Sequence, residues 1–199
     1  TGTGVSVETK AAYGFNGPVY ALETDGTNLY VGGKFSKYGY VAGSLQILDS
    51  LTGGTPEGVI NPFVDGAVSS IESDGNGGWY IGGLFSKIYG IPKFALAHLY
   101  ADGKIDKNFS YNSNSSVTRL KKKDNIIFVT NGFELTSIDL LTGYENWTIS
   151  ITGGSGSSVY SLETYNNVLF IGGNFTSIAG ESRNYLAAVN IEDGSLLSW

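Results

Sequence analysis

Short apolar runs alternate with turn-forming residues along the whole chain, and one such run recurs. The run LYVGGKF at 29–35 returns as WYIGGLF at 79–85 and LFIGGNF at 169–175, with a weaker copy, IFVTNGF, at 127–133. Aromatic and β-branched residues favour buried strands, and Gly-Gly inside a strand pattern marks a bulge, a bend or a close backbone approach. Each copy therefore predicts a core strand. A phosphate-cradling loop would instead need a following helix and a Lys-Ser/Thr pair, which these segments lack.

A second short strand precedes each core strand, and these strands begin at Val19, Val68, Val117 and Val159. By subtraction the starts lie 49, 49 and 42 residues apart. A loop, a third strand ending in a turn and a weaker fourth strand follow each core strand. Four strands in such a repeat match the spacing of propeller blades.

We therefore predict an all-β fold, a β-propeller region over 1–199 with four repeat units of about four antiparallel strands. The predicted units are 19–66, 67–116, 117–158 and 159–199, with 1–18 as the last strand of a preceding blade. Because the chain starts just before a fourth strand and ends within one, we expect it to be part of a longer array.

The loop after the core strand varies most between units. It spans 36–44, 86–93 and 176–184, and the third unit lacks most of it. In a propeller these loops share one face with the links between blades. We predict a binding face there, beside a notch in the third unit, formed by Tyr38, Tyr40, Tyr89, Arg183 and Asn184. Such residues suit a glycan or a loop of a protein partner. Alternatively, the tyrosine rings pack against the blade edge and only their hydroxyls reach water.

The net charge and the amino-acid composition of the chain exclude several classes of partner and ligand. A net charge of −6 and a pI of about 4.7 argue against nucleic acid, and no run of apolar residues is long enough to predict a membrane span. The absence of Cys excludes disulfides and thiolate zinc sites. His98 is the single histidine, so we expect it to be packed and not to join a multi-histidine metal site. We expect no metal and no cofactor.

N-x-S/T sequons occur at Asn108, Asn114, Asn146 and Asn174. In a secreted eukaryotic chain these would be glycosylation sites. In a chain rich in Asn, Ser and Thr, several also arise by chance.

The segments IGGNFTSIAGESRNYLAAVNIEDGSLLSW and FALAHLYADGKIDKNFS carry a family resemblance. They resemble the delta-60 type repeats of bacterial and phage β-propeller proteins, and the chain is also similar to fungal Rax2-type cortical polarity proteins. The resemblance covers nearly the whole chain, more weakly in the third unit. It implies a propeller architecture and supplies no catalytic residues.

No catalytic constellation is found in the sequence, so we expect a protein that is not an enzyme. The favoured function is an extracellular or cell-surface propeller that serves as a structural scaffold or an adhesion and recognition module. Propellers host many functions, and two alternatives stay open. One is part of a propeller enzyme, a glycan hydrolase or lyase, whose active site lies outside this segment. The other is a phage virion structural protein.

Overall fold

The computed structural model describes residues 14–38, 41–111, 115–153 and 158–198, and every regular element within them is a β-strand. The first unit holds β1 (Val19–Thr24), β2 (Asn28–Gly33), β3 (Lys37–Tyr38), β4 (Val41–Ala42) and β5 (Leu45–Asp49). The second unit holds β6 (Ala67–Ser73), β7 (Trp79–Leu84), β8 (Lys87–Ile88), β9 (Ile91–Pro92) and β10 (Leu96–Leu99). The third unit holds β11 (Arg119–Lys123), β12 (Ile126–Thr130), β13 (Glu134–Asp139) and β14 (Glu145–Thr152). The fourth unit holds β15 (Ser158–Tyr165), β16 (Val168–Asn174), β17 (Ser177–Ile178), β18 (Glu181–Ser182) and β19 (Leu186–Asn190).

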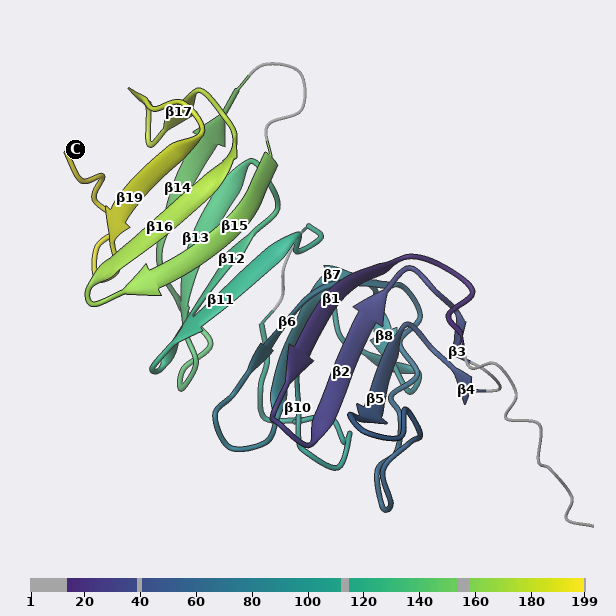
Figure 1. The fold of residues 1–199 in the computed structure, drawn as a ribbon. Coiled ribbons are helices and arrows are strands. Elements are labelled where there is room, and N and C mark those ends of the chain that lie inside the picture. The colour runs from purple at the N-terminus through teal and green to yellow at the C-terminus, as the bar shows by residue number, and fades with distance from the viewer. Residues whose placement is uncertain (1–13, 39–40, 112–114, 154–157, 199) are drawn as a thin grey trace, which may run out of the picture.

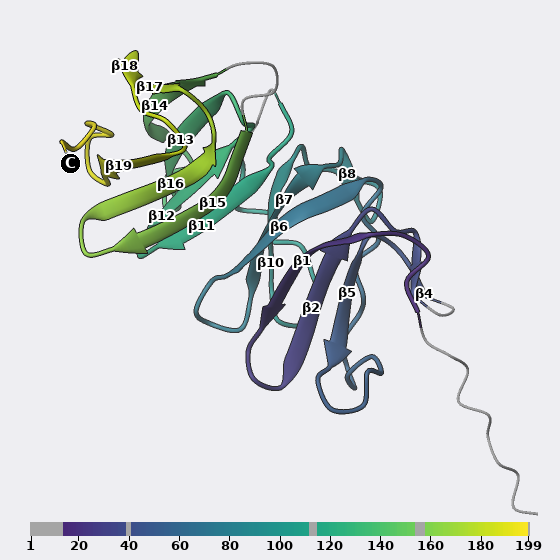
Figure 2. The ribbon, with the colours of Figure 1, turned by 45° about the horizontal axis from the view of Figure 1, so that its top comes forward.

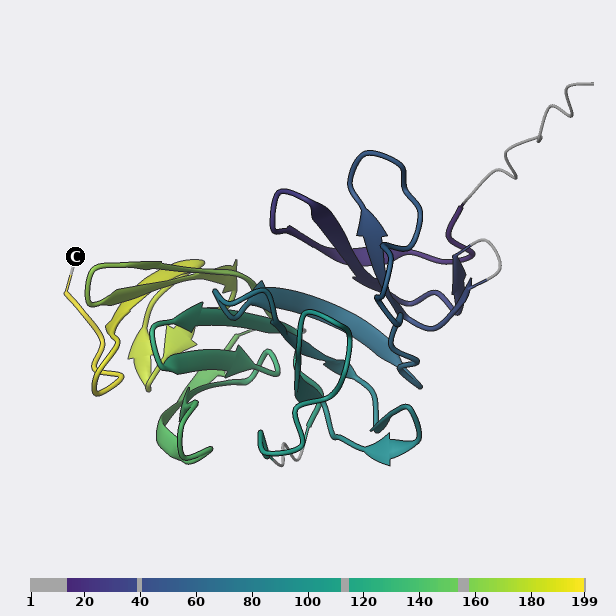
Figure 3. The same cartoon turned by 90° about the horizontal axis from the view of Figure 1, so that it is seen from below.

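These strands form antiparallel sheets that follow one another along the chain (Figure 1). Three sheets have the orders β1-β2-β5, β6-β7-β10 and β15-β16-β19, while β11-β12-β13-β14 is extended by β17 and β18. The first strands of successive units, β1, β6, β11 and β15, lie next to one another. The sheets fan out without closing into a ring (Figure 3). The all-β, antiparallel prediction is confirmed.

The expected fourth strand differs between units. In the described residues it is a full strand only in the third unit, where β14 pairs with β13 from Glu134↔Ser150 to Ile138↔Glu145. In the second and fourth units it is reduced to single bridges, Leu99↔Ile105 and Val189↔Leu196. The prediction of about four strands per unit therefore holds in full for the third unit alone.

Each Gly-Gly pair lies opposite a β-bulge in the first strand of its unit. Val19 pairs with Gly33 and Ala21 with Gly32, so Tyr20 is the extra residue. The same shift occurs between Val68 and Ser70 in the second unit and between Val159 and Ser161 in the fourth. A side chain on the second glycine would meet backbone: a Cβ built at Gly83 would lie 2.1 Å from the carbonyl oxygen of Ala67.

The third unit lacks the glycine pair, the bulge and the following hairpin together. There β11 pairs with β12 in one unbroken register, from Arg119↔Thr130 to Lys123↔Ile126. The phenylalanines after the core strands of the other units, Phe35, Phe85 and Phe175, are buried, whereas Phe133 is exposed. The hairpin that would cover Phe133 is replaced by a short turn.

Apolar cores fill the spaces between neighbouring sheets. Tyr30 of the first unit packs on Trp79 of the second, with ring centroids 3.6 Å apart. Tyr80 and Leu120 belong to the next core, and Phe128 belongs to the one between the third and fourth units. Burying a side chain of this size contributes about 1.5–3 kcal/mol. Burial on both faces explains the continuous apolar runs in the core strands.

Candidate functional site

The loops after three of the core strands form short hairpins, β3–β4, β8–β9 and β17–β18, at one end of their sheets (Figure 2). Each hairpin pairs with the chain that comes from the preceding unit. The second unit makes this contact through Val64↔Ile88, and in the fourth unit β17 pairs with β14 through Ile151↔Ile178. The hairpins therefore fasten each unit to the one before it, beside the links, on the face where a binding surface was predicted.

A polar side chain in the link holds the start of a hairpin. Oδ1 of Asp65 accepts the N–H groups of Ser86 and Lys87 at 2.8 and 2.9 Å, and its Oδ2 accepts the Ser86 hydroxyl at 2.6 Å. Asn16 does the same in the first unit, where its Oδ1 accepts the N–H groups of Ser36 and Lys37 at 2.9 Å. Burial alone would raise the pKa of Asp65, but these hydrogen bonds outweigh it and hold the pKa below its ordinary value.

The two described tyrosines of the predicted binding face use their hydroxyls within the fold. Oη of Tyr38 donates to the carbonyl oxygen of Gly53 at 2.9 Å. Oη of Tyr89 lies 3.1 Å from the carbonyl oxygen of Ile60 and 3.3 Å from that of Gly103. Burial raises the pKa of Tyr89. Tyr38 thus holds its hairpin to the rest of its own unit, whereas Tyr89 holds its hairpin both to Gly103 of its own unit and to Ile60 of the first unit.

The other predicted residues are more dispersed. Nη1 of Arg183 donates to the carbonyl oxygen of Ser182 at 2.8 Å, and Nη2 lies 3.5 Å from Glu181. Asn184 is exposed in the same unit. Tyr40 lies outside the described residues. Tyr38, Tyr89 and Arg183 belong to three different units and contact different partners, so they do not by themselves define one site.

A polar cavity of about 290 Å³ opens in the third unit, where the hairpin is missing. Oη of Tyr111 donates to Oε1 of Glu145 across this cavity at 3.0 Å. Elsewhere in the lining, Nδ2 of Asn131 donates to Oε2 of Glu134 at 3.4 Å. Burial, followed by the bond to Glu145, raises the pKa of Tyr111 far above its ordinary value. The cavity therefore offers carboxylates together with a protonated phenol.

An apolar hollow of about 330 Å³ adjoins the cavity, and the two share Ser115 and Ser116 in their walls. Leu84 and Phe94 line the hollow with largely exposed side chains. The acidic cavity and the apolar hollow therefore adjoin each other, and Tyr38, Tyr89, Arg183 and Asn184 do not line either of them. Sequence reasoning missed the lining of the cavity, because Tyr111 and Glu145 lie 34 residues apart and meet only in the folded unit.

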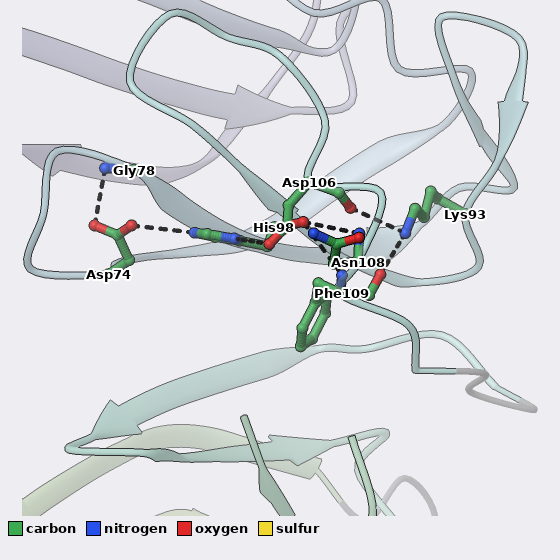
Figure 4. Close-up of polar contacts among 7 residues, drawn as sticks. All are labelled: Asp74, Gly78, Lys93, His98, Asp106, Asn108 and Phe109. Atoms are coloured by element: carbon green, nitrogen blue, oxygen red, sulfur yellow. Dashed lines mark hydrogen bonds and ion pairs between the residues drawn. The ribbon is translucent and has the colours of Figure 1, made fainter. Parts of the chain in front are cut away.

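A buried polar cluster lies in the second unit and joins three of its segments (Figure 4). Nδ1 of His98, on β10, lies 2.9 Å from Oδ2 of Asp106, and Nε2 lies 3.1 Å from Oδ2 of Asp74. Oδ1 of Asp74 accepts the N–H of Gly78 at 2.8 Å. Both ring nitrogens donate at once only when the imidazole carries two protons. The cluster connects the β6–β7 turn, β10 and the link after β10.

Aromatic rings cover this cluster. Tyr80 stacks on His98 at 4.4 Å between centroids, and Phe109 meets Tyr80 edge-on at 5.4 Å. Burial, then the two carboxylates, raises the pKa of Tyr80 to about 12. Burial alone would raise the pKa of Asp74 and Asp106, but hydrogen bonds from His98 and from backbone N–H groups outweigh it and place both below 3.8. With both nitrogens engaged, His98 acts as a packed structural residue.

Lys93 closes the other side of the cluster (Figure 4). Its Nζ donates to the carbonyl oxygens of Asp106, at 3.3 Å, and of Phe109. Burial lowers the pKa of Lys93.

Within the described ranges, no group of three or more His, Asp and Glu side chains is placed to hold a metal ion. None of the described residues forms a helix suited to crossing a membrane.

The sequons are distributed over the second, third and fourth units. Asn108, Asn146 and Asn174 are all exposed, and Nδ2 of Asn146 donates to Oγ of Ser137 at 3.2 Å. Asn114 lies outside the described residues. Glycosylation at these positions stays a prediction.

Comparison with known proteins places the fold among β-propellers. No family model matches the sequence, and no curated protein matches it. The computationally designed Ika4 protein superposes with a TM-score of 0.59 at 17% identity, over 89% of this chain and 94% of that one. The WD40 domain of Neurospora crassa Pan2 superposes with a TM-score of 0.56 at 13% identity, over 92% of this chain and 65% of that one.

The AfRom2 CNH domain gives a TM-score of 0.56 at 9% identity, over 87% of this chain and 51% of that one. The chain therefore spans less than two thirds of each of the two natural domains. WD40 repeats form β-propellers, and the likeness establishes a propeller-like arrangement of sheets.

Proposed function

We propose that this chain is a non-catalytic module made of four propeller blades from a larger array, and that it serves as a scaffold with a protein-recognition face. The recognition site is the acidic cavity of the third unit together with the apolar hollow beside it. The observation that carries the proposal is their position: they open where the hairpin of one unit is missing, on the face formed by the hairpins and links.

The chemistry of the site favours a peptide segment that presents a basic side chain next to an apolar one. Glu134 and Glu145 supply negative charge in the cavity, and Leu84 and Phe94 supply exposed apolar surface in the hollow. Carboxylates bind Lys and Arg side chains through charge-assisted hydrogen bonds, and apolar anchors contribute much of the affinity in protein interfaces.

Selection from a random peptide library on the immobilised chain tests this function. We expect the recovered peptides to combine Lys or Arg with aromatic or aliphatic residues. Their affinity should fall at least about tenfold on a variant with Glu134→Gln and Glu145→Gln, as loss of charged hydrogen bonds predicts. Glu181→Gln, an exposed glutamate on another hairpin, is the matched control.

If the peptides bound wild type, the double variant and Glu181→Gln equally well, the recognition site would lie outside the acidic cavity. A glycan array run in parallel would favour carbohydrate recognition if glycans, and not peptides, bound in a manner sensitive to the same double variant.

A further inference from the structure

Three asparagines of the chain, Asn16, Asn76 and Asn131, are each followed by a glycine. Cγ of an asparagine side chain is open to attack by the backbone nitrogen of the next residue, and a glycine there places no side chain in the way. The three Asn-Gly pairs therefore have the same chemistry in the unfolded chain. Their surroundings in the fold decide which of them reacts.

The side chain of Asn16 is fixed by the hairpin that it holds. Its Oδ1 accepts the N–H groups of Ser36 and Lys37 at 2.9 Å, and its Nδ2 donates to Oγ of Ser36 at 3.0 Å. Turning the amide toward the nitrogen of Gly17 would break these bonds. Gly17 is also tightly packed, because a Cβ built there would lie 2.3 Å from the carbonyl oxygen of Lys34.

Both reacting groups of the pair at Asn131 are engaged. Oδ1 of Asn131 accepts the N–H groups of Phe133 and Glu134 at 2.9 and 2.8 Å. The nitrogen that would attack belongs to Gly132, and its N–H donates to Oγ1 of Thr130 at 3.0 Å. Several hydrogen bonds must therefore open before this pair can react.

Asn76 is held by no such contact among the described residues. It lies exposed in the turn between β6 and β7. Within that part of the chain, no hydrogen bond engages its side chain or the nitrogen of Gly77. Gly77 has a φ of 87° and is followed by another glycine, so the backbone at the attacking nitrogen keeps the freedom that glycine provides.

We propose that Asn76 is a site of spontaneous deamidation, a modification that Asn16 and Asn131 resist. The nitrogen of Gly77 loses its proton to water or hydroxide and bonds to Cγ of Asn76, which expels ammonia and leaves a five-membered succinimide. Water then opens this ring. Breaking the bond from the nitrogen to Cγ gives aspartate, and breaking the bond to the main-chain carbonyl carbon gives isoaspartate, whose backbone runs through Cβ and Cγ.

The modification alters the turn that positions Asp74. Oδ1 of Asp74 accepts the N–H of Asn76 at 2.6 Å and that of Gly78 at 2.8 Å, and its Oδ2 faces His98 (Figure 4). Isoaspartate adds one carbon to the backbone between these two N–H groups, so both no longer reach one oxygen atom without distortion. Isoaspartate at position 76 therefore weakens the hold of the turn on Asp74, whereas ordinary aspartate adds only an exposed charge.

Incubation of the intact chain at mildly alkaline pH, followed by peptide mapping with mass spectrometry, measures the loss of each asparagine. We expect Asn76 to be lost at least about tenfold faster than Asn16 or Asn131, because those side chains must first open several hydrogen bonds. The same incubation in concentrated urea is the matched control, and there the three rates should become similar. The proposal is overturned if Asn76 reacts no faster than the other two in the folded chain, or if the same difference persists in urea.

Two variants separate the added charge from the lengthened backbone. Asn76→Asp supplies the charge on an ordinary backbone, and Asn76→Gln keeps an amide whose attack would close a less favourable six-membered ring. The isoaspartate form, separated from incubated wild type by chromatography, should unfold at a lower urea concentration than fresh wild type. Asn76→Asp, and Asn76→Gln after the same incubation, should unfold close to fresh wild type.

Hydrogen exchange locates the effect in the turn. The Gly78 amide should lose at least about tenfold of its protection in the isoaspartate form, as expected for a lost hydrogen bond to a carboxylate. Asn76→Asp should keep that protection. An isoaspartate form with the Gly78 protection and the urea midpoint of fresh wild type would show that the modification leaves Asp74 in place, against the proposal.

Discussion

Two glycines at the same place in the repeat have different surroundings. A Cβ at Gly82 would meet Val117 and Leu120 of the next sheet, whereas a Cβ at Gly172 would meet one flexible hydroxyl. The sequence predicted a bulge, a bend or a close approach at these pairs without deciding between them. In the structure the bulge lies in the opposite strand and the close approach comes from the neighbouring sheet. Neither depends on residues near the glycines in sequence, so pattern alone could not assign them.

Alanine substitution at the two positions should therefore have unequal effects. Gly82→Ala should lower the free energy of unfolding by about 1–3 kcal/mol, because the added methyl group overpacks a core that cannot yield. Gly172→Ala should lower it by less than about 1 kcal/mol, the ordinary range of a surface change. Urea denaturation of wild type and of the two variants measures both values. Equal losses would show that the neighbouring sheet is not the cause.

The hairpins are elements whose existence the sequence did not predict. The segments 86–93 and 176–184 were expected to be loops, yet each forms paired two-residue strands. Their turns have positive φ at both central residues, 52° and 78° at Tyr89 and Gly90, and 52° and 82° at Ala179 and Gly180. Type I′ turns require this geometry, but Asn-Gly or Asp-Gly is the recognisable signal for them. Tyr-Gly and Ala-Gly carry that signal only weakly.

Asp65 offers a test of how these hairpins are held. Asp65→Ala removes the acceptor of the Ser86 and Lys87 N–H groups and should lower the free energy of unfolding by about 0.5–1.5 kcal/mol. Asp65→Asn should cost much less, because Asn16 makes the equivalent bonds with an amide oxygen. Hydrogen exchange should show the Lys87 amide losing protection in the alanine variant and keeping it in the asparagine variant. Identical behaviour of the two variants would show that the hydrogen bonds to Asp65 do not hold the hairpin in place.

At the scale of the molecule, repetition in the sequence predicted the all-β class that the structure shows. The buried Asp74–His98–Asp106 cluster was not predictable, because its members come from a turn, a strand and a link. Oδ1 of Asp74 binds the N–H groups of its own turn, whereas its Oδ2 faces His98. A single carboxylate thus serves local and long-range structure, and only the local role leaves a sequence signal.

The Asp74–His98–Asp106 cluster makes the free energy of unfolding depend on pH in the acidic range. The folded-state pKa values of Asp74 and Asp106 lie below the ordinary value of about 3.8. A lowered carboxyl pKa contributes stability that is complete above the unfolded-state value and is lost as pH falls through the folded-state value. The free energy of unfolding should therefore decrease as the pH falls below about 4. It should change little near neutral pH on account of these two groups.

Asp74→Asn isolates the contribution of one charge, because the amide oxygen still accepts the turn N–H groups that Oδ1 binds. We expect the variant to be about 1–3 kcal/mol less stable at pH 6, from loss of a buried charge-assisted hydrogen bond to His98. Its stability should also fall less steeply than wild type between pH 5 and about pH 3. Urea titrations across this range measure both effects, with Asp124→Asn, at a largely exposed side chain, as the control. If Asp74→Asn and wild type show parallel pH profiles, the charge on Asp74 does not hold His98 in place, and the cluster is maintained by the packing of Tyr80 and Phe109 instead.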